Sequence, residues 1–224
     1  MKLSIVIPVF NNWNFTKSTL NDLTKLPKDH EIIIVDNGSV DETTHLVSSD
    51  NLVIHRFDKN MGFGAASNRG YELARGEFVL FLNNDIRVLA DHSGWTQPLI
   101  HGASKGAVVG PTGGLLDKYF NFVHETTKLE SGNFYMSGWC LCGSKEVFDK
   151  LIPEDNKIKG PFSEEFFVYF EDTDLGFRIR ELQIPFKIIP VPVVHFGKMT
   201  SRKLNVSELF LNSKKIFVNK WAGR

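Results

Sequence analysis

Polar side chains that can bind a metal or move a proton follow apolar runs at three places in this chain. The first group, Asn83–Asp85, comes directly after Phe78–Leu82, a run typical of a strand buried in a parallel sheet. A carboxylate flanked by amides at the carboxyl end of such a strand suits a hard cation that carries phosphate oxygens. The second group is Glu171–Asp174, and the third is His195, which ends the run Val191–Val194. Together they predict a metal-held phosphate donor and a separate general base.

The acidic group Glu171–Asp174 follows residues 164–170, a stretch rich in aromatic side chains. A carboxylate that emerges from an apolar wall is partly desolvated, which raises its pKa and makes it a better base. Glu171, Asp172 and Asp174 cannot all face one point, because helical neighbours two apart diverge. Acids in the first turn of a helix also complement its dipole, so a purely structural role is the alternative.

The other two groups have structural alternatives as well. Asn83–Asp85 is also compatible with an ordinary turn, and we favour a metal site because Asp36 ends another predicted strand at the same sheet edge. A lone histidine such as His195 is more often structural than a metal ligand. Lys198 and Arg202 lie just beyond it and either neutralise a diphosphate or are solvated charges.

Two further segments have the character of a nucleotide site. Asp36, with Asn37 after it, can accept hydrogen bonds from a base imide or a ribose hydroxyl, although turn chemistry explains the segment equally well. Asn60–Gly70 is rich in small residues that let a backbone approach a ligand at a helix N-terminus. Gly62–Gly64 begins a dinucleotide fingerprint, but Ser67 replaces its third glycine, so a nicotinamide site is not favoured.

The first part of the chain alternates strands and helices. The predicted strands are Leu3–Val9, Glu31–Val35, Leu52–Phe57 and Phe78–Leu82, and the predicted helices are Trp13–Leu26, Asp41–Ser48 and Phe63–Ala74. This order argues for a parallel sheet with right-handed crossovers.

From about residue 106 glycines and prolines break the pattern, and residues 119–137 show no clear period. The elements predicted beyond this point are the strands Met136–Gly143, Phe186–Ile189 and Val191–Phe196 and the helices Lys145–Leu151, Asp172–Leu182 and Val206–Trp221. No segment resembles a linker. We therefore expect one domain over residues 1–224, with a nucleotide half (about 1–105) and an acceptor half (about 106–224).

The bulk properties exclude several classes of protein. The 224 residues are 42% hydrophobic and carry 26 basic and 26 acidic side chains, so nothing global favours nucleic acid as a partner. No apolar run approaches the roughly 20 residues of a membrane span, and the first residues read as a strand rather than a signal peptide.

Cys140 and Cys142 lie two apart on a predicted strand, where they cannot bond each other. We expect free thiols in a cytoplasmic protein.

Five motifs in this order resemble the inverting family 2 glycosyltransferases, over nearly the whole chain. They are Ser4–Asn11, Ile33–Ser39, the pair Asn60–Gly64 and Asn68–Gly70, Leu82–Asp85, and Glu171–Asp172 followed by His195–Gly197. The third motif is similar to the version found in rhamnosyltransferase-like members. In the fourth, Asn83 replaces the first aspartate of the family's Asp-x-Asp metal motif, and after His195 Lys198 replaces a frequent glycine.

The resemblance implies a GT-A fold, an α/β architecture with a Rossmann-like, mostly parallel central sheet flanked by helices. It implies Mn²⁺ or Mg²⁺ held by Asp85 and His195, and Asp172 as the base beside Glu171. It also implies a nucleoside-diphosphate sugar donor, carried by uridine or deoxythymidine and with rhamnose as one candidate sugar. The donor contacts that it implies are Pro8, Phe10, Asn11, Asp36, Asn37, Asn60, Gly62, Asn68, Asn83 and Asn84.

The residues of the acceptor half do not identify one class of acceptor. A glycan, a lipid-linked sugar or a glycoprotein is compatible with the resemblance. Trp139 and Tyr169 are candidates for stacking on an acceptor sugar, with burial in the core as the alternative for Trp139. The segment Lys214–Trp221 could contact a membrane surface, but a helix whose apolar side packs on the domain is favoured.

Two rival functions remain open from the sequence. A sugar-phosphate nucleotidyltransferase would normally carry a glycine-rich loop with arginine and lysine after the first strand, where this chain has Val9–Trp13. A binding module that has lost turnover is the second rival, and the presence of Glu171 and Asp172 argues against it.

Overall fold

The structure, a computed structural model, describes residues 1–89, 93–197 and 206–223. Lys198 and Arg202, the candidate diphosphate contacts, lie outside these ranges.

The central sheet forms around two strands that are buried on both faces. Every residue of β1 (Leu3–Val9) and β4 (Phe78–Leu82) is buried, as their continuous apolar sequences predict. β1 pairs in parallel with β2 (His30–Asp36) and with β4, and β2 pairs in parallel with β3 (Leu52–Arg56). The carboxyl ends of these four strands therefore lie at one edge of the sheet.

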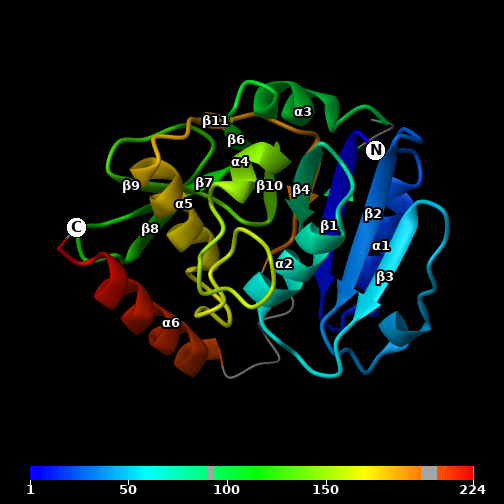
Figure 1. Ribbon diagram of the computed structural model, residues 1–224, viewed down its shortest axis with the longest axis horizontal. Helices are drawn as coiled ribbons and strands as arrows, with labels where there is room; N and C mark the ends of the chain where they lie inside the picture. Colours follow the sequence, from blue (N-terminus) through cyan, green and yellow to red (C-terminus); the bar gives the residue numbers. More distant parts are fainter. Residues whose placement is uncertain (90–92, 198–205, 224) are drawn as a thin grey trace.

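The second half of the chain completes this sheet. β10 (Cys140–Ser144) pairs antiparallel with β4 and with β6 (Val108–Gly110), and β11 (Phe186–Ile188) pairs in parallel with β6. The order of the seven strands is β11-β6-β10-β4-β1-β2-β3, and Figure 1 shows β4, β1, β2 and β3 side by side. The sheet is mixed but mostly parallel, which is the predicted fold class.

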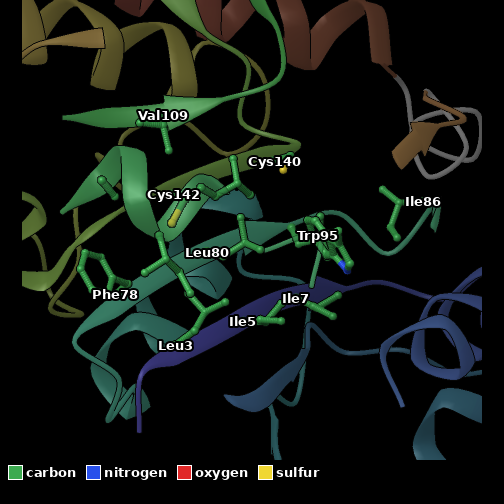
Figure 2. Close-up of a cluster of buried hydrophobic side chains, with 14 of the residues drawn as sticks. Leu3, Ile5, Ile7, Phe78, Leu80, Ile86, Trp95, Val109, Cys140 and Cys142 are labelled. Atoms are coloured by element: carbon green, nitrogen blue, oxygen red, sulfur yellow. The ribbon is translucent and has the colours of Figure 1, made fainter. Parts of the chain in front are cut away.

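Helices cover both faces of the sheet. α1 (Trp13–Leu23) and α3 (Gln97–Ala103) contribute to one hydrophobic cluster, and α2 (Phe63–Leu73), α4 (Lys145–Asp149) and α5 (Glu171–Glu181) contribute to another. Figure 2 shows the first cluster, in which side chains of β1, β4 and β10 gather with Trp95. Cys140 and Cys142 both belong to this cluster and are free thiols, as predicted.

Two small sheets and the last helix complete the fold. β5 (Ile86–Val88) pairs antiparallel with β12 (Val193–His195), and β7 (Gly113–Leu116) lies between β8 (Phe122–Thr126) and β9 (Asn133–Met136). α6 (Val206–Trp221) lies near α5, on the side of the molecule away from β3 (Figure 1). Its Phe217 and Trp221 are buried in an aromatic cluster, so its apolar side packs on the domain. Among the helices of the described ranges, none has the length and apolar character that a membrane crossing requires.

Two predicted elements differ from the structure. The helix expected over 41–48 is a short 3₁₀-helix, η1 (Glu42–His45), after which Leu46 is extended. Arg56 donates hydrogen bonds to the carbonyls of Thr44 and Leu46, which holds the chain in this non-helical path. The strand expected over 136–143 is two strands in different sheets, β9 and β10, because the chain leaves one sheet at 136 and enters the other at 140.

Candidate active site

A cavity of about 310 Å³ lies where β1, β2 and β4 end. Both halves of the chain contribute to its walls. The predicted site residues that line it are Pro8, Phe10, Asn37, Asn60, Gly62, Asn83, Asn84, Asp85, Trp139, Tyr169, Glu171, Asp172 and His195. Residues that are far apart in the sequence therefore meet around one space. Asp85, Asp172 and His195 are among them, whereas Asp36, which was also expected there, is not.

Asp85 and His195 form the candidate metal site. Asp85 follows β4, and the pairing of β12 with β5 places His195 opposite Ile86, next to that aspartate. His195 Nε2 lies 3.1 Å from Asp85 Oδ1 and 3.1 Å from the side-chain nitrogen of Asn83. The backbone N–H of Phe196 also donates to the Asp85 carbonyl, at 3.0 Å. One imidazole nitrogen and one carboxylate oxygen are thus held side by side.

These donors fit Mn²⁺ or Mg²⁺ in a site that is completed by a substrate. Manganese accepts both carboxylate and imidazole ligands, and magnesium is usually held by one or two carboxylates together with phosphates and water. Within the described residues no group of three or more histidine, cysteine or acidic side chains could hold a metal on its own. Asp85 and His195 would therefore leave most coordination positions to phosphate oxygens and water.

Asn84 lines the cavity, but its side chain turns towards α1. Its Nδ2 donates to Thr16 Oγ1 at 2.9 Å, and its backbone carbonyl accepts from Thr19 Oγ1 at 2.6 Å. Asn84 thus ties the end of β4 to α1, and only its remaining surface is available to a donor.

Asp172 and Glu171 begin α5 at the cavity wall, in two different environments. Asp172 Oδ2 accepts a hydrogen bond from the Gly138 N–H at 3.0 Å, and Oδ1 accepts from the Thr173 N–H at 2.7 Å. Burial raises the pKa of Asp172, and these bonds oppose the rise. Glu171 is 8% exposed, and its Oε2 has no hydrogen-bond partner within the described ranges. Burial, with the Asp172 charge adding to it, raises the pKa of Glu171 to about 8.

Asp174 faces away from the cavity. It is fully buried and pairs with Arg178 at 2.8 Å and with Lys220 at 2.9 Å, and it accepts a hydrogen bond from Trp221 Nε1 at 2.9 Å. The three acids therefore do not converge, as helical geometry predicts.

The turn into α5 has an unusual backbone. Tyr169 and Phe170 have φ values of 65° and 68°, in the left-handed region that bulky residues rarely adopt. The Phe170 ring is held in the aromatic cluster under α6. Such strain is typical of functional sites, where the surrounding structure maintains it.

Asn37 and Asn60 build the loop on the nucleotide side. Asn37 Nδ2 donates to Asn60 Oδ1 at 2.9 Å and to the Gly62 carbonyl at 3.1 Å, and Asn37 Oδ1 accepts from the Met61 N–H at 2.8 Å. Gly62 has a φ of 92°, and a Cβ there would lie 2.5 Å from the Phe167 carbonyl oxygen. Only glycine fits this close contact between the two halves.

Three predicted donor contacts do not line the cavity. Asn68 is fully buried, donates to the Phe162 carbonyl at 2.8 Å and accepts from the Phe162 N–H at 3.0 Å. Its predicted role in donor binding is wrong, because both ends of its amide hold the loop before α5. The side chain of Asn11 accepts from the Val40 N–H, and that of Asp36 accepts from the Ser39 N–H, both at 2.9 Å. The geometry does not support a donor contact for either.

Trp139 belongs to both the cavity wall and the core. It is 9% exposed, and its indole N–H donates to Thr112 Oγ1 at 2.8 Å. The His195 ring stacks on it, with centroids 4.8 Å apart. The core alternative is thus confirmed for most of this side chain. Tyr169 packs edge-on against Phe210 of α6, at 5.6 Å between ring centroids.

Sequence reasoning missed Gly138 and Thr112, which position the functional side chains. A Cβ at Gly138 would lie 3.0 Å from the Asp172 Cβ, so glycine lets this backbone approach the candidate base. The available signal was the glycine beside Trp139 in a region without periodicity. Nothing in the sequence around Thr112 indicates that it orients Trp139.

The charged side chains that line the described part of the cavity are acidic. Asp85, Glu171 and Asp172 line it, and among the described residues neither lysine nor arginine does. A cation would offset the charge of a diphosphate bound there, which is compatible with Asp85 and His195 as candidate metal ligands.

Comparison with known proteins gives an independent result. Residues 4–149 match the protein family described as Glycosyl transferase family 2. This match covers more than half of the chain and includes Asp85, but it ends before Glu171, Asp172 and His195.

Two curated relatives are similar over part of the chain. One is the poly(ribitol-phosphate) beta-glucosyltransferase of Bacillus spizizenii, 36% identical over 94 residues, which are 38% of this chain and 15% of that protein. The other is the poly(ribitol-phosphate) beta-N-acetylglucosaminyltransferase TarS of Staphylococcus aureus, 34% identical over 93 residues, 38% of this chain and 16% of TarS. The chain thus matches a small part of each relative.

Two solved structures share the fold. A crystal structure of Staphylococcus aureus TarS has a TM-score of 0.55 at 21% identity, covering 80% of this chain and 55% of that chain. The mannosyltransferase PcManGT from Pyrobaculum calidifontis, solved with GDP-Man and Mn²⁺, has a TM-score of 0.59 at 15% identity, covering 84% and 55%. At these identities the likeness shows the fold, and it confirms the predicted GT-A architecture.

Proposed function

The chain belongs to glycosyl transferase family 2, and from this premise we propose that it transfers a sugar from a nucleoside-diphosphate sugar to a hydroxyl acceptor, with Mn²⁺ or Mg²⁺ as cofactor and with inversion at the anomeric carbon. One observation carries the proposal: Asp85, His195 and Asp172 line a single cavity. The metal ligands and the base can therefore act on one bound molecule.

Asp85 and His195 would hold the metal, with Asn83 beside them. The bound cation would supply charge neutralisation for the diphosphate as it departs. The protein's own contribution is orientation, because Trp139 stacks on the His195 ring and fixes the direction of Nε2. Neither lysine nor arginine lines the described cavity wall, so neutralisation there would depend on the cation that Asp85 and His195 would hold.

Asp172 would act as the general base. Its oxygens lie on the cavity wall, oriented by the N–H groups of Gly138 and Thr173. Asp172 takes the proton of an acceptor hydroxyl, and the hydroxyl oxygen bonds to the anomeric carbon as the bond from that carbon to the diphosphate breaks. The electron pair of the broken bond leaves with the diphosphate. Attack from the face opposite the leaving group inverts the configuration.

The proposed donor is a uridine- or deoxythymidine-linked sugar, and this choice rests on the resemblance of Ile33–Ser39 to the family's nucleotide motif rather than on a contact seen for Asp36. TarS and its Bacillus relative are named for glucose-type transfer, and PcManGT was solved with GDP-Man. None of these three names points to rhamnose, so the rhamnose donor rests on the motif formed by Asn60–Gly64 and Asn68–Gly70 alone. A donor panel must therefore contain glucose, N-acetylglucosamine, mannose and rhamnose nucleotides.

The acceptor is a glycan, a lipid-linked sugar or a glycoprotein that reaches Asp172 past Tyr169. Tyr169 is the better candidate for acceptor contact, because His195 already occupies one face of Trp139.

Hydrolysis of nucleotide sugars tests this proposal without knowledge of the acceptor. The wild-type protein should release the nucleoside diphosphate from at least one donor of the panel in the presence of Mn²⁺, and EDTA should abolish the release. Asp172→Asn is the matched control, since it changes the base and leaves the metal ligands in place. Failure with every donor would favour a binding module, and release of pyrophosphate from a nucleoside triphosphate would favour a nucleotidyltransferase.

A further inference from the structure

A group of exposed apolar side chains lies where the start of β8 meets α6. Its members are Tyr119 (67% exposed), Phe122 (57%), Val123 (52%) and Leu211 (63%). Lys214 of α6 donates a hydrogen bond to the side chain of Asn121, which joins the helix to the segment that carries the first three (Figure 1). Leu211 and Lys214 are three apart on the helix, so they share a face. Exposed apolar side chains that gather at one place, rimmed by polar groups, mark an interaction surface.

The turn between β7 and β8 holds this surface in shape. Asp117 Oδ1 accepts hydrogen bonds from the N–H groups of Tyr119 and Asn121, both at 2.8 Å. Between them, Phe120 has a φ of 60° and packs its ring against Phe217 of α6, with centroids 5.3 Å apart. Phe120 therefore anchors the turn to the aromatic cluster, while its neighbours stay exposed. The surface is formed before any partner binds.

Lysines accompany these apolar side chains. They are Lys118, Lys214 and Lys215. The ammonium group of Lys118 lies 5.0 Å from the centroid of the Tyr119 ring, so one of the charges stands directly over the apolar surface. Acidic groups of the same segment have other partners, since Asp117 holds the turn and Glu130 pairs with His124 at 3.0 Å. We call the four apolar and three basic residues the β8 patch.

These charges argue against a second copy of this chain as the partner. In a two-fold dimer the same patch faces itself, so lysines would meet lysines. Pairing through the free edge of β8 is also disfavoured, because lysines and irregular register blunt an edge strand. Lys118 and Lys128 flank β8, and its ladder with β7 shifts register between Leu115 and Leu116.

An anionic lipid surface complements the same side chains. Tyrosine, phenylalanine and leucine are favoured at the level of lipid headgroups, and lysines beside them are attracted to anionic lipids. We propose that the β8 patch docks this protein on a bilayer that contains anionic lipids. The four apolar side chains enter the headgroup region, and the three lysines face lipid phosphates.

The β8 patch adjoins the candidate active site. Glu125, near the end of β8, accepts a hydrogen bond from the Trp139 indole N–H at 3.4 Å, and Trp139 lines the cavity. Docking would thus bring lipid headgroups close to the cavity. Among the three acceptor classes this arrangement favours a lipid-linked sugar. That last step rests on the proposed glycosyl transfer, whereas docking itself does not.

Sedimentation with vesicles tests docking without donor or acceptor. The wild-type protein should bind vesicles of phosphatidylcholine mixed with phosphatidylglycerol, and should bind less to phosphatidylcholine alone or in high salt. The double variant Tyr119→Ser, Phe122→Ser removes two exposed rings and should weaken binding by about tenfold or more. No binding of the wild-type protein to the mixed vesicles would overturn the proposal. So would a dimer in solution that this double variant dissociates, because the patch would then belong to a second copy.

A matched pair of apolar substitutions controls for exposure alone. Val40 and Val47 flank η1 and are 89% and 76% exposed, at the β3 side of the molecule. The double variant Val40→Ser, Val47→Ser should bind mixed vesicles like the wild-type protein. A loss equal to that of Tyr119→Ser, Phe122→Ser would overturn the assignment to the β8 patch.

The lysines need a control of equal charge. Lys118→Gln with Lys214→Gln should weaken binding to mixed vesicles by about fivefold for each lysine. Lys28→Gln with Lys105→Gln changes the net charge equally at two other exposed positions and should have a smaller effect. Equal effects of the two pairs would show attraction by overall charge and would overturn the proposal.

A fluorescent label on the patch gives a second measurement that does not depend on lost binding. Cys140 and Cys142 are fully buried, so a thiol-reactive, environment-sensitive dye should label Val123→Cys at the new position. Its emission should shift to the blue when mixed vesicles are added, whereas the same dye on Val40→Cys should not respond. No shift at position 123 would overturn the proposal.

Transfer tests the acceptor class, with a donor that the wild-type protein hydrolyses. Transfer to a sugar carried on a lipid in mixed vesicles should exceed transfer to the same sugar free in solution. Tyr119→Ser, Phe122→Ser should lower only the former, and equal rates for both acceptors in the wild-type protein would overturn the acceptor class. If no donor is hydrolysed, glycosyl transfer itself fails, and vesicle binding still decides the docking.

Discussion

The imidazole of His195 lies nearly parallel to the indole of Trp139, with ring centroids 4.8 Å apart and planes 11° apart. The indole is fixed in turn by its hydrogen bond to Thr112 Oγ1 at 2.8 Å. The face of the imidazole is thus covered, and its Nε2 is directed at Asp85 Oδ1, 3.1 Å away. Trp139, a candidate for acceptor stacking with core burial as the alternative, thus orients a candidate metal ligand.

Removing the indole should therefore weaken metal-dependent nucleotide binding. An aromatic pair contributes about 0.5–1.5 kcal/mol, so Trp139→Leu should raise the Kd for nucleotide with Mn²⁺ by about two- to tenfold. Trp139→Phe keeps a ring against His195 and should have the smaller effect. Calorimetry on both variants measures which substitution weakens nucleotide binding more. Equal affinities for Trp139→Leu and the wild-type protein would contradict a role for the stacked rings.

Asp85→Ala should remove most of the metal-dependent part of nucleotide binding. Mutating even the outer-shell partners of metal ligands typically costs about 10- to 100-fold in metal affinity, and loss of the carboxylate itself should cost at least that much. Binding measured in EDTA provides the control and should match the wild-type value. Unchanged affinity in Mn²⁺ would exclude Asp85 as a ligand.

The position of Asp85, the candidate metal ligand, was predictable because the strand before it is simple to recognise. β4 is buried on both faces and has a continuous apolar sequence, so its end is marked by the first polar residues, Asn83–Asp85. The sequence likewise predicted that Glu171, Asp172 and Asp174 cannot all face one point, which follows from helical geometry alone. Glu171 and Asp172 line the cavity, and Asp174 does not.

The wrong and missed predictions concern residues whose roles depend on contacts that the local sequence does not show. Asn68 is an amide among small residues, which is typical of a ligand contact. Its side chain is instead directed at the backbone of Phe162, 94 positions away. β8 was missed because its residues Phe122–Glu125 are all exposed, which leaves no alternation to detect. The role of Gly138 depends on an approach to Asp172 that no local pattern encodes.

Asp174→Asn should destabilise the fold. Asp174 is fully buried between Arg178 and Lys220, and breaking a buried ion pair costs about 3–5 kcal/mol. Asp172→Asn makes the same change two residues earlier, where a carboxamide oxygen can still accept from the Gly138 N–H, and should leave stability near the wild-type value. Urea unfolding of the two variants measures the difference. Equal stabilities would contradict the separate roles assigned to these acids.

Glu171→Gln should change how stability depends on pH. Burial raises the pKa of Glu171 from 4.5 to about 8, so the folded state holds a proton that the unfolded state releases. The stability from this group is complete below pH 4.5 and is lost as the pH rises towards 8. Glutamine does not titrate, so the variant should gain stability relative to the wild-type protein across this range. Thermal unfolding at several pH values checks this, and parallel curves would contradict it.

The central claim is that the base Asp172 and the metal ligands serve one reaction in one cavity. Comparing Mn²⁺-dependent donor turnover and donor affinity in the wild-type protein and Asp172→Asn tests it most directly. In Asp172→Asn turnover should fall by about 10²–10⁴ while the Kd for nucleotide with Mn²⁺ is unchanged. Turnover close to that of the wild-type protein would contradict it.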